Sequence, residues 1–598
     1  MRFILAIFCA CTFTLASGAQ PDPKDHSPEK HAVRESRCHK AAMRDGVKLS
    51  VDIYRPQSDE RRPAILVITP YSNNSPGLIE RARWFARRGY GVAVADSRGR
   101  YDSDGDWDPF DARHKTDGYD LVEWLAKQPW CDGNVGMMGG SYLGWTQWWT
   151  ATQTPPSLKA IVPEVAPPDQ LYNGPYQDGI LVCWMMDWAA AQAGRTLQTV
   201  GPGAYGGFVA TRHKDFLELP YVKLCARRGA VDAPWFETWI RDNLASSAYW
   251  RGISYQTPQS YAKVNVPSLN ITGWFDANYP GTPRNYAAMK KHGATPAARR
   301  PRMVVGPWMH AFNTTRALSG IDFGKEAMIN WNGYVCRWFD RYLKGRKNGV
   351  DDDAPVHLFV LGSNRWRSAP DWPLPETRWT KFYLHSGGKA NSSKGDGTLD
   401  TTLPGDEPAD RYTHNPADPV PDTFTSGHVD GPIDTRKGAQ RSDVLVYSSP
   451  ALTEAVEVIG PVEATLYAAT SARDTDWMMR LIDVRPDGHC ALLCDGVIRA
   501  RCRDPQSHAF NAARLSTIGP GKVHEYKLSF WRGTGNLFKK GHRIRIEVSS
   551  TFFPYYLPNP GTGEDNVGLQ TRRVTAQQRV LHDSKHPSHV VLPVVSRK

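Results

Sequence analysis

The sequence has no concentrated run of basic residues, although 73 lysines and arginines outnumber 61 acidic residues and give a net charge of +12. Because this excess is spread along all 598 residues, no tract marks a nucleic-acid surface. Cysteines are few, at ten, and no histidine or cysteine pair with zinc-ligand spacing flanks the group Cys490, Cys494 and Cys502. These absences argue against a nucleic-acid partner and against a metal site.

Long apolar runs are also scarce, and the clearest one, residues 3–15, lies at the N-terminus. It follows the short basic start Met1-Arg2 and precedes the small residues Ala16-Ser17-Gly18-Ala19, the pattern of a secretory signal peptide. A helix that crosses a bilayer needs about 20 apolar residues, so the run is too short for a membrane span. We therefore expect a signal peptide over residues 1–19 and a secreted or periplasmic protein.

What the sequence does contain is a serine in a glycine-crowded turn, within N-V-G-M-M-G-G-S-Y-L-G (134–144). An apolar run enters this turn and a helix-compatible stretch leaves it. Glycines on both sides of Ser141 allow a sharp strand-to-helix turn that exposes the hydroxyl. The pattern predicts a nucleophilic serine, although the second glycine comes one place later than in the common G-x-S-x-G elbow.

A serine nucleophile needs a base and an acid that orients the base, and in α/β-hydrolases these follow in the order Ser, acid, His. The segment P-S-L-N-I-T-G-W-F-D (267–276) reads as a short buried strand that ends at glycine, with Asp276 just beyond it. The segment R-M-V-V-G-P-W-M-H (302–310) repeats this design with His310. Their order and placement at strand ends predict a Ser141–Asp276–His310 triad.

The oxyanion of an acyl-transfer intermediate needs two hydrogen-bond donors. One is expected to be the backbone N–H of Tyr142, the residue after the nucleophile. The run A-I-L-V-I-T-P-Y (64–71) ends an earlier strand with Tyr71, whose phenol O–H is a suitable second donor.

Five motifs together give a specific resemblance. They are T-P-Y (69–71), G-Y-G-V-A-V-A-D-S-R-G (89–99), Q-P-W-C-D-G-N-V-G-M-M-G-G-S-Y-L-G (128–144), G-W-F-D (273–276) and G-P-W-M-H (306–310). The chain resembles the cocaine-esterase-like CocE/NonD hydrolases, which are related to X-prolyl dipeptidyl-peptidases and α-amino-acid ester hydrolases. The resemblance implies the triad and oxyanion donors named above and no cofactor, and G-x-S-Y-x-G is this family's own elbow.

The expected fold class is α/β: an α/β-hydrolase core with an inserted helical cap, followed by an all-β jelly-roll domain. Buried apolar runs that alternate with helical stretches predict the parallel sheet of the core. These runs lie at 64–69, 91–95, 135–138, 160–162, 267–272 and 302–305, and helices are expected at 117–127 and 334–344. After a polar linker, short strands such as 356–361, 443–447, 464–468 and 542–549 indicate the β domain.

These patterns divide the chain into a catalytic domain over 35–167 and 265–346, a cap over 168–264 and a C-terminal domain over 354–598. The cap is rich in tryptophan, and Trp184 and Trp188 lie one helical turn apart. Together with Trp145 and Phe275, beside the predicted nucleophile and acid, they are the candidate substrate-pocket residues. The segment F-F-P-Y-Y-L-P (552–558) either reaches this pocket or closes a β-turn.

Eight cysteines follow residue 19, and in an exported protein they are able to form disulfides. The candidate pairs are Cys183 with Cys225 and two of Cys490, Cys494 and Cys502, and buried free thiols are the alternative. The sequence does not decide the pairing or the oligomeric state.

The substrate predicted from the candidate catalytic and pocket residues is a small-molecule ester or acyl compound. An aminopeptidase must hold the substrate's ammonium group with a carboxylate, because an unpaired buried cation is costly. The α-amino-acid ester hydrolases that this chain resembles carry acidic residues soon after the elbow serine, whereas the positions here are Leu143, Gly144 and Trp145, which carry no charge. This favours an esterase. A dipeptidyl-peptidase that uses Asp178 or Asp187 is the alternative, and a carbohydrate-binding protein with an inert core is the second.

Overall fold

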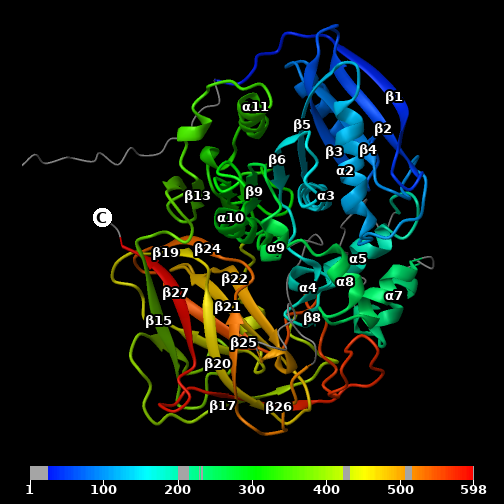
Figure 1. Ribbon diagram of the computed structural model, residues 1–598. Helices are drawn as coiled ribbons and strands as arrows, with labels where there is room; N and C mark the ends of the chain where they lie inside the picture. The colour runs from blue at the N-terminus through cyan, green and yellow to red at the C-terminus, as the bar shows by residue number, and fades with distance from the viewer. Residues whose placement is uncertain are drawn as a thin grey trace, which may run out of the picture.

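The computed structural model of the protein describes residues 25–198, 215–227, 229, 233–421, 431–504 and 515–596. The predicted signal peptide, residues 1–19, lies outside the described residues. Figure 1 shows an α/β core, a group of short helices beside it and a β-rich domain that follows in the chain. The expected fold class is confirmed: an α/β-hydrolase core with an inserted helical cap precedes a β-rich C-terminal domain.

A 10-stranded sheet forms the centre of the core. It is parallel from β4 to β13, with antiparallel strands at both edges. In spatial order the strands are β1 (Val33–Ala42), β2 (Lys48–Pro56), β4 (Gly91–Asp96), β3 (Arg62–Thr69), β5 (Cys131–Gly140), β6 (Leu158–Glu164), β9 (Leu269–Gly273), β10 (Arg302–Gly306), β13 (Val356–Val360) and β14 (Arg365–Ala369). All residues of β4, β9 and β10 are buried, as expected for a parallel sheet covered on both faces.

Five longer helices pack against this sheet. They are α1 (Pro76–Ala86), α2 (Arg113–Ala126), α3 (Tyr142–Ala151), α10 (Gly281–His292) and α11 (Trp331–Tyr342). Helix α11 buries Val335, Trp338 and Phe339 on one stripe, and its N-cap residue Asn330 accepts a hydrogen bond from Gly333 N–H. The strand and helix positions expected from apolar periodicity are thus occupied by these elements to within a few residues.

The core sheet extends beyond the expected end of the catalytic domain at residue 346. The strand expected at 356–361 is β13, which pairs in parallel with β10, and β14 then pairs antiparallel with β13. Five successive residues after a linker do not reveal which sheet they join, because pairing depends on distant partners. The polar segment 345–353 therefore connects two parts of the same sheet.

The cap lies between β6 and β9 in the chain and consists mainly of short helices (Figure 1). Its described elements are α4 (Gln170–Asn173), β7 (Tyr176–Gln177), β8 (Ile180–Leu181), α5 (Cys183–Ala191), α6 (Leu224–Arg227), α7 (Pro234–Arg241), α8 (Ala248–Ile253) and α9 (Pro258–Tyr261). Helix α5 begins directly after the β7–β8 hairpin, so the position of that hairpin sets the position of Trp184 and Trp188.

The C-terminal domain contains a 13-stranded network of β-strands. Its strands are β15 (Thr377–His385), β16 (Thr398–Asp400), β17 (Asp410–His414), β18 (Leu445–Ser448), β19 (Val456–Gly460), β20 (Glu463–Thr470), β21 (Asp476–Val484), β22 (Cys490–Arg499), β23 (His524–Ser529), β24 (Thr534–Phe538), β25 (Arg543–Ser549), β26 (Ala576–Leu581) and β27 (His589–Val595). Alternating Ile544, Ile546 and Val548 of β25 are fully buried, as their period-two pattern predicts.

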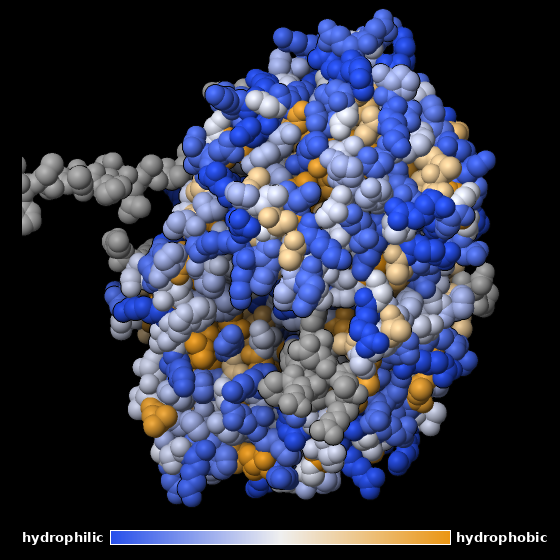
Figure 2. All heavy atoms as spheres, viewed as in Figure 1, coloured by the Kyte–Doolittle hydropathy of each residue, from blue (hydrophilic) through white to orange (hydrophobic). Residues whose placement is uncertain are grey.

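The C-terminal domain is attached to the core through backbone pairing. Leu361, which follows β13, donates its N–H to Gly535 O at 2.8 Å and accepts from Leu537 N–H at 2.9 Å. On the face shown in Figure 2, the surface of the core is largely hydrophilic, and hydrophobic residues gather near the junction of the core and the C-terminal domain. The two domains therefore share buried surface.

Within the described part of the chain, none of the eight cysteines is in a disulfide, so neither candidate pair forms. Seven of them are buried and Cys38 is exposed. No helix in the described ranges is long and apolar enough to cross a membrane.

Candidate active site

Ser141 occupies a strained turn between β5 and α3. Its backbone has φ 61° and ψ −122°, a combination that costs a non-glycine residue about 1–3 kcal/mol and tends to occur at functional sites. Ser141 N–H donates to Glu164 O at 2.9 Å, which fixes the turn against the end of β6. The side chain is partly exposed at the carboxyl edge of the sheet, where α/β proteins bind ligands.

The two glycines of the motif have separate steric reasons. Gly139 has φ +139°, and a Cβ there would lie 2.7 Å from Leu143 Cβ. A Cβ on Gly144 would lie 2.5 Å from Ala166 Cβ, because α3 passes directly over the residues that follow β6. The close approach of α3 to Ala166 therefore explains why the second glycine of G-x-S-Y-x-G is at position 144, one place later than in the common elbow.

Asp276 and His310, the predicted acid and base, are in contact. His310 Nδ1 lies 2.8 Å from Asp276 Oδ1, and the Asp276 side chain is fully buried. Thr272 Oγ1 donates to Asp276 Oδ2 at 2.8 Å, and Asn278 N–H donates to Asp276 Oδ1 at 2.9 Å. These donors hold the carboxylate in one orientation, so the imidazole Nδ1–H has a fixed acceptor and Nε2 is the nitrogen available as a base.

The three residues follow strands of one parallel sheet. Ser141 follows β5, Asp276 follows β9 and His310 follows β10, and the order β5-β6-β9-β10 brings the carboxyl ends of these strands to the same edge. Asn278, which the sequence analysis did not single out, donates to Asp276 and to Val165 O at 3.2 Å. Its only sequence signal is its position two residues after the predicted acid.

Tyr71 and Tyr142, the predicted oxyanion donors, lie on either side of Trp188 from the cap. Trp188 Nε1–H donates to Tyr71 Oη at 3.0 Å, and the Trp188 ring stacks on the Tyr142 ring at 6.1 Å between centroids and 22° between planes. A hydroxyl that accepts a hydrogen bond becomes a better donor. Tyr142 N–H is in the first turn of α3, where helical N–H groups have no acceptor within the helix.

The four candidate pocket residues have different surroundings. Trp188 is partly exposed and contacts Tyr71. Trp145 is 4% exposed, stacks on Trp149 and donates to Pro168 O at 2.9 Å. Trp184 is 9% exposed. Phe275 is fully buried against Phe323 and lines a cavity of about 270 Å³ shared with the C-terminal domain.

The segment 552–558 pairs with the cap and does not only form a turn. Cys183 N–H donates to Tyr555 O, and Leu557 N–H donates to Leu181 O, both at 2.9 Å. Val182 and Tyr556 form an isolated β-bridge. The C-terminal domain therefore contacts the residues that lead into α5.

Arg100 is a further buried residue at this site that sequence reasoning missed. It is fully buried, and its Nε donates to Pro70 O, the carbonyl directly before Tyr71, at 2.9 Å. An arginine after a loop glycine reads as solvent-exposed, so no local pattern distinguishes it. Among the described residues, no group of histidine, cysteine and acidic side chains is arranged to hold a metal ion.

A strained serine after a parallel strand and a histidine–carboxylate pair after two later strands define a hydrolase of the α/β-hydrolase class. Residues 45–312 match the family model of X-Pro dipeptidyl-peptidase (S15 family), and residues 348–591 match the model of the X-Pro dipeptidyl-peptidase C-terminal non-catalytic domain.

Among curated proteins, the chain is 36% identical to cocaine esterase from Rhodococcus sp. (strain MB1 Bresler), over 93% of this chain and 97% of the relative. Two solved structures are also similar. An aminopeptidase from a marine sediment Thaumarchaeota archaeon matches with a TM-score of 0.80 and 25% identity, over 98% of this chain and 99% of its own. An α-amino acid ester hydrolase matches with a TM-score of 0.79 and 24% identity, over 98% and 100%. The chain belongs to the cocaine-esterase-like CocE/NonD family of serine hydrolases.

Proposed function

We propose that this protein is an exported carboxylic-ester hydrolase that acts through an acyl-enzyme. Ser141 is the nucleophile, His310 the base and Asp276 the orienting acid, with Tyr71 O–H and Tyr142 N–H as oxyanion donors. The observation that carries the proposal is the 2.8 Å contact of His310 with the fully buried Asp276, at the sheet edge where Ser141 occupies its strained turn. The fold alone does not require a strained serine and a histidine–carboxylate pair at the same edge of the sheet, so their joint presence supports a catalytic role.

The reaction proceeds in two halves. His310 removes the proton of Ser141, whose Oγ attacks the ester carbonyl, and the resulting oxyanion accepts from Tyr71 and Tyr142. His310 then gives the proton to the leaving alcohol. Water enters, loses a proton to His310 and attacks the acyl-serine, so that the acid leaves and Ser141 is restored.

Ester substrates with a small uncharged acyl group fit the surroundings of Ser141 best. Leu143, Gly144 and Trp145 follow the nucleophile and are buried without charge, so they provide no partner for a substrate ammonium group. The relative at 36% identity over most of the chain is a cocaine esterase. Aromatic Trp188, partly exposed beside Tyr71, is suited to contact an apolar substrate group.

Dipeptidyl-peptidase activity is the second candidate. Both parts of the chain match X-Pro dipeptidyl-peptidase family models, and a similar structure is an aminopeptidase. A peptidase of this kind needs a carboxylate for the substrate's α-ammonium group. The cap offers two candidate carboxylates: Asp187, one residue before Trp188 on α5, and Asp178, between β7 and β8. Both are at least nine-tenths buried.

The test compares a short-chain p-nitrophenyl ester with Gly-Pro-p-nitroanilide for the chain from residue 20 and for its Ser141→Ala variant. Serine-dependent ester cleavage with little anilide cleavage supports the esterase. Fast anilide cleavage would make the peptidase the function and Asp187→Asn the next variant. Silence on both substrates, together with no labelling of Ser141 by a fluorophosphonate, would contradict a hydrolase and favour a binding protein.

Export is part of the same proposal and rests on residues 1–19. N-terminal sequencing of the protein recovered outside the cytoplasm is expected to begin after Ala19. Recovery of an uncleaved chain from the cytoplasm alone would contradict export.

A further inference from the structure

Arg100 is a buried cation whose partners are backbone carbonyls. It is fully buried, and it donates from Nε to Pro70 O at 2.9 Å and from Nη1 to Gln192 O at 3.2 Å and to Gly194 O. In the described part of the chain, Arg100 forms no ion pair with a carboxylate, and its Nη2 has no hydrogen-bond partner. Keeping a charge buried in this way is costly.

The contacts of Arg100 converge on Tyr71 from two directions. Pro70 O belongs to the peptide group that joins Pro70 to Tyr71, so the Nε bond fixes the backbone of the tyrosine. Gln192 is the C-cap residue of α5, the helix whose Trp188 donates to the Tyr71 hydroxyl. One guanidinium thus holds both the main chain of Tyr71 and the end of the helix that orients its phenol.

Aromatic rings keep the guanidinium in place and exclude water. Its Cζ lies 5.0 Å from the centroid of the Trp107 ring and 5.5 Å from that of Tyr101. Trp107 Nε1–H also donates to Gln192 O, at 2.9 Å. Burial lowers the pKa of Arg100 to about 10, partly offset by the neighbouring Tyr101, Tyr71, Tyr142 and Asp96, so the side chain is still a cation at neutral pH.

We propose that Arg100 is a positioning residue for the oxyanion hole: it fixes the backbone of Tyr71 and the end of the helix that orients the Tyr71 phenol. This inference rests on the proposed function of Ser141 and Tyr71. A hydrogen-bond donor that is already held in place stabilises the anionic transition state more than the neutral ground state. Loss of Arg100 is therefore expected to lower kcat more than it raises KM.

The test uses Arg100→Met and Arg100→Lys, with Arg195→Met as the matched control. Arg195 is exposed and donates to carbonyls of the same loop, at Gly105 and Tyr101, so its loss disturbs the loop without removing the buried charge. We expect kcat for ester hydrolysis to fall about 10²-fold in Arg100→Met with KM within about twofold, because loss of one oxyanion donor has an effect of that order. Arg100→Lys restores part of kcat, and Arg195→Met stays close to wild type.

Several results would overturn the inference. A kcat for Arg100→Met within about threefold of wild type, or a loss confined to KM, would exclude the role. So would an equal loss in Arg195→Met. If Arg100→Met fails to fold, Arg100→Lys alone is the test. A kcat of Arg100→Lys equal to that of wild type would then count against a role for the planar guanidinium group. Activity that survives Ser141→Ala would instead refute the proposed function itself, which separates the two failures.

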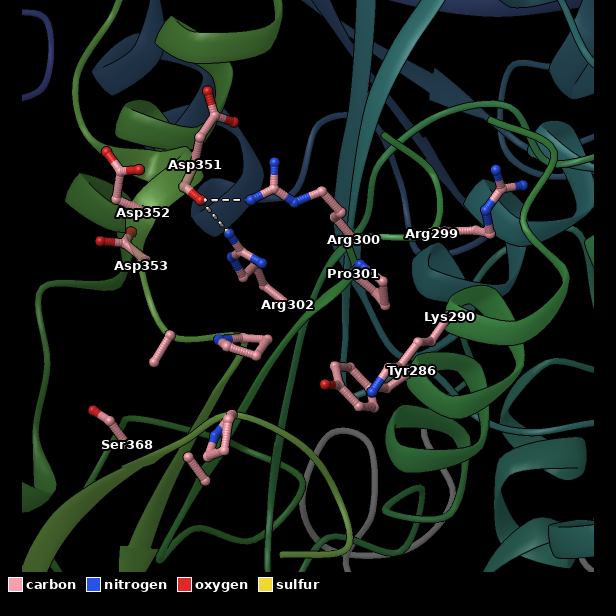
Figure 3. A pocket seen from close by; sticks show the side chains of 14 residues that line it. Tyr286, Lys290, Arg299, Arg300, Pro301, Arg302, Asp351, Asp352, Asp353 and Ser368 are labelled. Atoms are coloured by element: carbon pink, nitrogen blue, oxygen red, sulfur yellow. Dashed lines mark hydrogen bonds between the residues drawn. The ribbon is translucent and has the colours of Figure 1, made fainter. Parts of the chain in front are cut away.

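A second inference concerns a cavity of about 680 Å³ at the amino-terminal end of β10, at the opposite edge of the sheet from Ser141 (Figure 3). Arg302 is 8% exposed and its Nε has no hydrogen-bond partner in the described ranges. Its Nη2 donates to Asp351 O at 3.2 Å, and Arg300 Nη2 donates to the same carbonyl at 2.9 Å. Two cations therefore meet at one neutral oxygen.

No carboxylate in the described ranges forms an ion pair with Arg300 or Arg302, although the charge of Asp353 acts on Arg302. Asp351 accepts from Arg341 Nε at 2.6 Å, and Asp353 is held by Arg337. Figure 3 shows the side chains of Asp351, Asp352 and Asp353 turned away from Arg300 and Arg302. Toward these arginines the loop presents the carbonyls of Asp351 and Val350, and the latter accepts from Arg302 Nη2 at 3.2 Å.

The geometry points to an anion site in this cavity that takes a phosphate-type oxyanion between Arg300 and Arg302. Planar guanidinium groups bind such oxygens through charge-assisted, often bidentate hydrogen bonds. The site is separate from the catalytic edge, so Ser141→Ala is expected to bind the anion as wild type does.

Inorganic phosphate, titrated calorimetrically at constant ionic strength, tests this site. Arg300→Met is expected to weaken phosphate binding about tenfold or more, and the control Arg365→Met, an exposed arginine paired with Glu326, is expected to leave it unchanged. A second arm with phosphatidylglycerol vesicles separates a lipid headgroup from the free ion as the source. The inference fails if neither probe binds, or if binding is the same in wild type and Arg300→Met.

Discussion

The close approach of α3 to the end of β6 predicts that Gly144→Ala impairs activity far more than stability. The new Cβ would lie 2.5 Å from Ala166 Cβ, whereas carbon atoms normally approach to about 3.5–4.0 Å, so α3 must shift by about 1 Å. Overpacking of this kind costs about 1–3 kcal/mol, and alanine returns about 1 kcal/mol through its higher helix propensity. The net change in the free energy of unfolding is about 0–2 kcal/mol.

Activity is expected to respond more strongly because α3 carries the nucleophile turn. Gln147 Nε2 donates to Gly139 O at 3.0 Å, and Gln147 Oε1 accepts from Val162 N–H at 2.9 Å, so a shift of α3 is transmitted to the ends of β5 and β6. A displacement of about 1 Å at reacting groups can cost about 10²-fold in rate. We expect kcat/KM for a p-nitrophenyl ester to fall by about this factor, with thermal unfolding changed by only a few degrees.

The partner of the clash supplies a specific control. Ala166→Gly removes the nearest atom, although Ala166 Cα at 2.9 Å and Glu164 O at 3.3 Å remain close to the new Cβ. The double variant Gly144→Ala/Ala166→Gly is therefore expected to be about tenfold more active than the two single-variant losses combined would predict. Wild-type activity in Gly144→Ala, or purely additive losses in the double variant, would refute the steric reasoning.

Three further outcomes are expected. Trp188→Phe keeps the stacking surface but deletes the donor to Tyr71, so kcat should fall about 2–10-fold, measured by ester hydrolysis, whereas equal activity would remove the tryptophan from the oxyanion hole. Asp276→Asn should lower kcat about 10⁴-fold with little change in unfolding temperature, and a loss below tenfold would contradict its role in a triad. His582 is buried, and burial alone lowers its pKa, but hydrogen bonds and charge from Asp410 and Glu407 outweigh this and raise the pKa above 6.5. Its stabilising contribution is fully present below about pH 6.5 and is lost as pH rises through the raised folded-state pKa, so urea unfolding should show less stability at pH 9 than at pH 6, and His582→Gln should flatten this dependence.

The parts of the fold that local patterns encode were predictable. Buried runs such as 91–95 and 302–305 became β4 and β10, because continuous apolar residues in a parallel sheet are covered on both faces. Placing Asp276 and His310 at strand ends was enough to bring them together, since carboxyl ends of parallel strands share an edge. The pairing of 356–361 with β10 of the core sheet was not predictable from local pattern, because strand partners are decided by distant residues.

The sequence predicted the residue types at the site much better than it predicted the directions of their side chains. Phe275 precedes the acid in sequence, yet its ring packs on Phe323, because successive residues around a strand end point in different directions. Trp145 lies on α3 but faces Trp149 and Pro168, whereas Trp188, from helix α5 of the cap, contacts Tyr71. Arg100 left no signal because its partners are carbonyls, which every residue has.

The C-terminal domain is connected to Tyr71, the proposed oxyanion donor, by a short chain of contacts, although it contributes no residue to the proposed triad. Residues 555–557 hold the backbone at 181–183, directly before α5 begins. Helix α5 carries Trp188 to the Tyr71 hydroxyl, and its C-cap Gln192 accepts from Arg100. The C-terminal segment therefore contacts the start of α5, and Arg100 contacts Gln192 at its other end. The orientation of Tyr71 therefore depends on contacts from the cap, the core and the C-terminal domain together.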